Sequence, residues 1–153
     1  MASQPYPLQI DCVWIASDRV GHVGAFVTAG VGPIPFTTLK PNADLSVGDV
    51  EEAILKLPKV SGYRLLVNIP KLDSFIEMVE RGIFVYDWSD VHRTKAESLQ
   101  AYEPLVVPLD PISLDRLPDR LRAYAAGTKF ETVAFAEGQL LNVEAYFESC
   151  AGR

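Results

Sequence analysis

The densest run of polar residues in the sequence lies between Tyr86 and Arg93. It contains Asp87, Asp90 and His92, and carboxylate oxygens together with an imidazole nitrogen are suitable ligands for a transition metal. An aspartate near a histidine can also act as a base and the group that orients it. These three residues therefore form a candidate ligand or metal site of a small-molecule-binding protein or hydrolytic enzyme.

The same run can also be read as a structural turn. Ser89 or Asp90 would cap the turn, Asp87 would pair with Arg93, and Trp88 would pack inward. The pattern Asp-x-x-Asp-x-His is short and occurs easily by chance. We therefore favour the structural interpretation, and we assign no metal and no cofactor.

Residues for nucleophilic catalysis are scarce. A serine or cysteine nucleophile needs a histidine base, and the sequence offers only His22 and His92. Cys12 lies in an apolar run, where burial would raise the thiol pKa, and the Gly-x-Ser-x-Gly elbow is absent. We assign no catalytic residue and expect no enzymatic activity.

A glycine- and proline-rich loop spans residues 29–35. Glycine allows close backbone approach and proline fixes the chain direction, so the loop has a defined shape. It lacks the Lys-Ser/Thr ending of a phosphate-binding loop. We expect a structural loop.

The chain is acidic, and the acids concentrate in its middle. Of 153 residues, 48% are hydrophobic and 22% charged, which is typical of a globular domain, and the net charge is -6. Residues 71–119 contain ten acids and five bases. This balance argues against a nucleic-acid partner and is compatible with a face that attracts a basic protein. A plain solvated surface would give the same composition.

Features of secreted or membrane proteins are not visible. The two cysteines, Cys12 and Cys150, do not form a disulfide framework, and residues 1–11 do not resemble a signal peptide. No apolar run approaches the roughly 20 residues of a membrane helix. We expect a cytoplasmic protein without a membrane partner.

Hydrophobic periodicity predicts one α+β domain over residues 1–153 in the order ββ-α-β-α-β-β-α-ββ. Its sheet is expected to be mixed or mainly antiparallel, with about three helices. Strands are predicted at 10–16, 22–28, 63–69, 83–88, 102–108, 128–136 and 139–143. Helices are predicted at 46–57, 72–81 and 117–126.

Local signals add detail to these elements. Ser46 is the expected cap of the first helix, and Asp73 or Ser74 that of the second. The apolar strand 63–69 is expected at the centre of the sheet, and the proline-bounded strand 102–108 near its edge. A reversal at residues 137–138 predicts a C-terminal hairpin to match the N-terminal one.

Three parts of the sequence together resemble a group of small bacterial cytosolic proteins. These parts are 11–16 through 30–35, then 82–93, then 102–104 through 111–112. Some proteins of that kind are immunity partners of secreted toxins. The resemblance implies a non-enzymatic inhibitor that binds a protein, and a basic toxin domain would suit the acidic middle of this chain.

These observations lead to one preferred hypothesis and two alternatives. The preferred one is an immunity-type protein-binding domain that binds through an acidic face. The alternatives are the Asp87, Asp90 and His92 ligand site described above, and a structural subunit of a homo-oligomer. For the preferred hypothesis, the predicted protein-binding residues are the acids Asp87, Asp90, Glu97 and Glu103, with Trp88 and Tyr102 as aromatic anchors.

Overall fold

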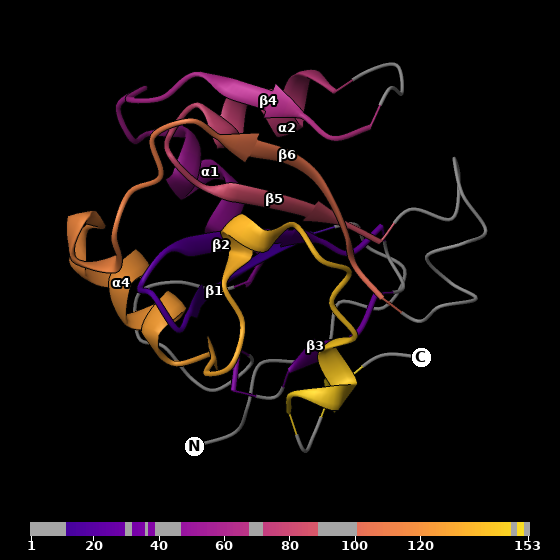
Figure 1. Cartoon of the computed structure of the whole chain (residues 1–153). Coiled ribbons are helices and arrows are strands. Elements are labelled where there is room, and N and C mark those ends of the chain that lie inside the picture. The colour runs from indigo at the N-terminus through magenta and orange to yellow at the C-terminus, as the bar shows by residue number, and fades with distance from the viewer. Residues whose placement is uncertain are drawn as a thin grey trace.

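A computed structural model describes residues 12–29, 32–35, 37–38, 47–67, 72–88, 101–147 and 150–151 (Figure 1). The strands are β1 (Val13–Asp18), β2 (Val23–Val27), β3 (Ile34–Pro35), β4 (Tyr63–Leu65), β5 (Phe84–Asp87), β6 (Glu103–Pro108), β7 (Lys129–Phe130) and β8 (Cys150–Ala151). The helices are α1 (Val50–Leu55), α2 (Asp73–Val79) and α4 (Asp119–Ala126), with 3-10 turns η1 (Val47–Asp49), η2 (Leu114–Arg116), η3 (Phe135–Glu137) and η4 (Val143–Ala145). The predicted α+β class and the predicted order of elements are confirmed.

The predicted N-terminal hairpin is formed by β1 and β2. The strands pair antiparallel from Val13 opposite Val27 to Ser17 opposite Val23. Asp18 begins the turn, and its fully buried carboxylate accepts hydrogen bonds from three successive backbone N–H groups of the turn. Gly21 adopts a φ of +95°, which favours glycine and explains its place in the turn.

The main sheet is mixed and has the strand order β4-β6-β5-β2-β1-β7. β2 pairs parallel with β5, and β1 pairs parallel with β7, whereas the other neighbours are antiparallel. One predicted position is wrong: β4 is the edge strand, not a central one, whereas β6 lies next to it and is therefore near the edge, as predicted. Tyr63 and Leu65 of β4 are 40% and 44% exposed, so the apolar side chains of this strand do not mark a central position.

The predicted C-terminal hairpin is also wrong. β7 contains only two residues and pairs with β1, and Leu141 forms an isolated bridge with Tyr102. β8 pairs with β3 in a separate two-stranded sheet. The physical reason is tertiary: Phe135 is buried against Phe26, so the chain after β7 bends into the core instead of continuing as a strand.

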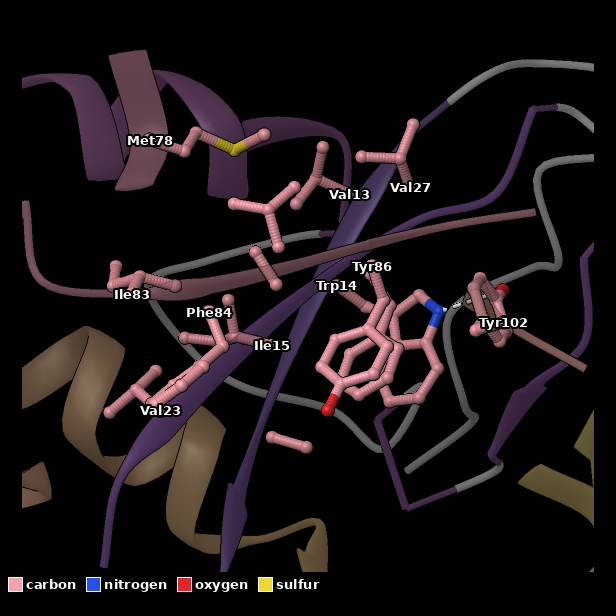
Figure 2. Packing of buried hydrophobic residues seen from close by; sticks show 14 of the residues in the cluster. Val13, Trp14, Ile15, Val23, Val27, Met78, Ile83, Phe84, Tyr86 and Tyr102 are labelled. Carbon is pink, nitrogen blue, oxygen red and sulfur yellow. Dashed lines mark hydrogen bonds between the residues drawn. The ribbon is translucent and has the colours of Figure 1, made fainter. Parts of the chain in front are cut away.

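Side chains alternate between the two faces of the sheet, and each face has its own cover. Phe26 stacks on Trp14 and Tyr86 with ring centroids 4.3 and 4.8 Å apart, and η3 covers this aromatic face through Phe135. Figure 2 shows Trp14, Tyr86 and Tyr102 grouped together within the core. The other face carries Val13 and Val27.

Helices cover the face that carries Val13 and Val27. α1 packs on β1, and α2 packs on β5 and β6. The buried residues of these helices are Val50, Ile54, Met78 and Val79, which follow the apolar spacing of the sequence. α2 begins after Leu72 without a side-chain cap, so the caps predicted at Asp73 and Ser74 are wrong, and Ser46 lies outside the described residues.

Candidate functional site

The predicted aromatic anchors are core residues. Trp88 and Tyr102 are 1% and 0% exposed, and their rings meet edge to face at 5.3 Å. The hydroxyl of Tyr102 accepts a hydrogen bond from Trp14 Nε1 at 3.2 Å and donates one to the carbonyl oxygen of Pro33 at 3.0 Å. Neither ring can reach a partner in this conformation, so their assignment as surface anchors is wrong. Tyr102 instead fixes the glycine- and proline-rich loop to the core.

The predicted acidic residues are divided between described and undescribed parts of the chain. Asp87 is only 5% exposed at the end of β5, and Glu103 is half-buried opposite it in β6. Asp90, His92 and Glu97 lie outside the described residues. The contact surface and the Asp87, Asp90 and His92 ligand site therefore stay predictions.

Asp18 is the most deeply buried carboxylate in the described part of the chain, and its role is structural. Oδ1 accepts from the backbone N–H groups of Val20, Gly21 and His22 at 2.9–3.0 Å, and Oδ2 accepts from that of Phe135 at 2.8 Å. Four donors use the lone pairs that a general base would need. The same bonds tie the hairpin turn to η3.

Two buried tyrosines are held in their neutral form. Burial raises the pKa of the Tyr86 hydroxyl well above its usual range, and the nearby Asp18 and Tyr146 raise it further. Burial likewise raises the pKa of Tyr124, with a smaller contribution from Cys12. A phenol so reluctant to ionise is a poor acid or nucleophile at neutral pH.

His22 is half-buried, and its ring lies 5.6 Å from that of Phe84. Its Nδ1 has no hydrogen-bond partner among the described residues, so no carboxylate there orients it as a base. Those residues also contain no group of three or more histidine, cysteine or acidic side chains placed to hold a metal ion.

A cavity of about 100 Å³ lies between α1, α2 and the open end of the β1–β2 hairpin. Its floor consists of Cys12, Val13, Val27 and Met78, all of them buried. The rim is formed by Glu51 of α1 and by Ser74 and Phe75 of α2, which are partly or fully exposed. We call this feature the α1–α2 cavity.

The hairpin fixes the floor of the α1–α2 cavity. Val13 and Val27 are paired across β1 and β2, so both side chains lie on the helix-covered face. Cys12 precedes β1, and its backbone N–H donates to the hydroxyl of Thr28 at 3.1 Å, which continues the pairing beyond the last strand residue. Asp87 is aligned with Val27 in the parallel neighbour β5, so a buried carboxylate lies beside the floor.

The helix ends around the α1–α2 cavity are acidic, and one of their acids, Glu51, lines the cavity. The first turns of α1 and α2 and the preceding η1 carry four acids and no base: Asp49, Glu51, Glu52 and Asp73. Each helix N-terminus contributes at most about +0.5 charge, so the two dipoles offset only about one of these negative charges. The ammonium group of Lys56 lies 3.7 Å from the carboxylate of Glu52, and both side chains are exposed. The net charge of these helix ends therefore stays negative.

Sequence reasoning missed the α1–α2 cavity. In the sequence, Asp49 and Glu51 are explained by the helix that they begin, because acids favour its positive end. The cavity depends on two helix N-termini meeting at the end of a hairpin, and this is a tertiary arrangement. Cys12 was correctly expected to be buried.

A second exposed feature lies at the edge strand β4. Apolar side chains gather there from the strand and its flanking loops, namely Val60, Tyr63, Leu65 and Leu109. The backbone groups of Tyr63 and Leu65 point away from β6, because Gly62 and Leu66 bond to Leu109 and Leu105 of the β6 side. This edge is short and carries the charge of Arg64, two features that limit non-specific strand pairing.

Comparisons with known proteins give no relative: no family model, no curated protein and no solved structure matches the chain. Within the described residues, no helix has the length and apolar character needed to cross a membrane.

Proposed function

We propose that this chain is a non-enzymatic protein-binding domain, an immunity-type inhibitor that captures a basic toxin domain in the bacterial cytoplasm. Its binding face is the acidic surface around the α1–α2 cavity. The observation that carries the proposal is the combination of four acids on two adjoining helix N-termini with a small cavity between them that has a buried floor. This face replaces Trp88 and Tyr102 as the centre of the contact surface.

The use of polar groups elsewhere supports this choice. The Asp18 carboxylate is consumed by four backbone N–H groups, and the Tyr102 hydroxyl by Trp14 and Pro33. Groups so engaged hold the fold in one conformation. A rigid fold suits an inhibitor, because a preorganised surface loses little entropy on binding.

Electrostatics favour a basic partner for the whole molecule as well as for the local face. The chain has a net charge of -6, and a complementary potential can raise association rates by ten- to a thousandfold at low ionic strength. Fast capture is what an inhibitor of an intracellular toxin requires. The rate advantage should shrink as salt screens the two fields, since the screening length is about 8 Å at physiological ionic strength.

Affinity capture from the native host tests the proposal. The tagged full chain is compared with Glu51→Lys/Asp73→Lys, which reverses charge at the cavity rim, and with Glu131→Lys/Glu144→Lys, which makes the same change on exposed sites of the C-terminal third. The expected result is one basic protein recovered by the wild-type chain and the control but not by the rim variant. Recovery of no protein, or equal recovery by both variants, would contradict the proposal.

A further inference from the structure

We infer that the α1–α2 cavity is the anchor pocket for one lysine or arginine side chain of the partner. The inference rests on the proposed function and gives that function a specific contact. The aliphatic stem of the partner residue lies across the apolar floor, and its charged head stays at the rim beside Glu51 and Ser74. Size, lining and charge support it separately.

The size of the cavity favours a side chain over a metabolite. Small-molecule sites usually measure roughly 300–1,000 Å³, whereas this cavity has about 100 Å³. A cavity that holds one water molecule has a volume of about 10–15 Å³, so this cavity has room for several atoms of the size of a water molecule. That space suits part of one side chain that is held in place by a larger interface around it.

The lining suits a residue that is apolar along its length and charged at its end. Val13, Val27, Phe75 and Met78 offer carbon and sulfur surface to a methylene stem. Glu51 and Ser74 place oxygen acceptors at the rim, where a cationic head can stay partly hydrated. This arrangement avoids the large cost of burying an ion completely.

The sign of the charge at the rim selects a cation. The four acids at the start of the two helices exceed the dipole contribution and the charge of Lys56 together by about two negative charges. An anionic side chain would meet this field unfavourably, and a neutral one would gain nothing from it. Arginine and lysine are therefore preferred over an aliphatic anchor of the same length.

The inference can be tested with fragments that mimic the two side chains, without the partner. The chain has two methionines, and Met78 lies in the cavity floor. With [¹³C-methyl]methionine, its NMR signal reports binding directly, and Met78→Leu assigns it. n-Butylammonium represents lysine, n-propylguanidinium represents arginine, and n-butanol and n-butyrate are the neutral and anionic controls.

The expected result is a saturable shift of the Met78 signal by both cations, with dissociation constants on the order of millimolar for such small fragments. Butanol should bind more weakly, and butyrate should cause no saturable shift. Glu51→Gln should weaken cation binding by about two- to fivefold, as expected for a partly exposed ion pair. Glu131→Gln, which removes one charge from an exposed site of the C-terminal third, is the control and should leave it unchanged.

Equal binding of butanol and butylammonium, or equal effects of Glu51→Gln and Glu131→Gln, would overturn the inference. The result is separable from that of the capture experiment. If the rim variant loses the partner but the cations do not bind, the anchor is wrong and the binding face stands. If the cations bind but the host yields no protein partner, the proposed function fails.

Discussion

Three buried tyrosines illustrate how differently one residue type is used in this core. The hydroxyl of Tyr102 makes two hydrogen bonds, one with Trp14 of β1 and one with Pro33, and so joins the sheet to the residue before β3. The hydroxyls of Tyr86 and Tyr124 are buried without a hydrogen-bond partner among the described residues. A buried polar group without a partner loses its hydration and gains nothing in return. The three side chains should therefore respond in opposite ways to removal of the oxygen.

Replacement by phenylalanine tests this contrast. Tyr86→Phe and Tyr124→Phe should keep the free energy of unfolding at neutral pH or raise it by up to about 1 kcal/mol, because only an unsatisfied hydroxyl is lost. Tyr102→Phe should lower it by about 1–2 kcal/mol, because Trp14 Nε1 and the Pro33 carbonyl lose their partner. Urea unfolding followed by the fluorescence of the two buried tryptophans measures all three. A destabilised Tyr86→Phe would show that its hydroxyl has an important partner.

The same two tyrosines make stability depend on alkaline pH. Their pKa values are raised in the folded chain, whereas an unfolded tyrosine ionises near pH 10. The unfolded state then releases protons more readily, so stability is fully present below about pH 10 and falls as the pH rises above it. Urea midpoints measured between pH 8 and pH 11 should show this fall, and the Tyr86→Phe/Tyr124→Phe double variant should show less of it. An identical fall in the double variant would assign the alkaline loss to other groups.

The sequence predicted the role of a residue correctly only where local preferences decide that role. The turn between the predicted strands 10–16 and 22–28 is an example, since the preferences of Asp18 and Gly21 for a turn are local. The protein-binding hypothesis requires Trp88 and Tyr102 at the surface, yet both lie in the core, as the structural interpretation of residues 86–93 predicts for Trp88. An aromatic ring beside charged neighbours can point inward from a strand while those neighbours point outward, and the sequence does not distinguish the two cases.

Element types followed from local patterns, but their places in the sheet did not. The apolar residues of β4 suggested a central strand, and the prolines that bound β6 suggested an edge. In the structure β4 is the edge itself, and Pro104 and Pro108 lie in the strand next to it, whose pairing with β5 is irregular. Strand order depends on which faces the helices cover, and that is decided by long-range packing.

Arg81 shows how one side chain connects two elements. Its guanidinium donates to the carbonyl oxygens of Leu55 and Leu57 at the end of α1, at 2.8 and 3.1 Å. It also donates to the carbonyl oxygen and the carboxylate of Glu77 in α2, at 2.6 and 3.0 Å. Nothing in the sequence pattern marked this residue, which follows α2 as an ordinary polar position. Its burial identifies it as the connection between the C-terminal end of α1 and α2.

Loss of this connection should be costly. Arg81→Met keeps the apolar stem but leaves several carbonyl oxygens without a donor, so the free energy of unfolding should fall by about 3 kcal/mol. Arg122→Met is the matched control, because Arg122 pairs with Asp119 on the surface of α4 and such a pair contributes at most about 1 kcal/mol. Parallel urea titrations give both values. A loss for Arg81→Met no larger than for the control would remove its role as the connection.

At the scale of the whole molecule, the C-terminal segment completes the core. Leu141 exchanges backbone hydrogen bonds with Tyr102, and both Leu141 and Val143 are fully buried. Phe147 packs edge to face on Phe130 at 5.0 Å. The aromatic face of the sheet is therefore closed by residues that come last in the chain, although the sequence suggested only a peripheral hairpin there.

Truncation separates this closing role from a peripheral one. A chain that ends after Gly138 loses the buried side chains of Leu141 and Val143, each worth about 1.5–3 kcal/mol, and also Phe147. That loss is comparable with the total stability of a small domain, so the shortened chain should show no cooperative thermal transition and little near-ultraviolet circular dichroism. A chain that ends after Phe147 loses β8 but keeps all three side chains, and it should melt cooperatively with a native-like spectrum. If the shorter chain also melted cooperatively near the full-length temperature, the aromatic core would be stable without its C-terminal cover.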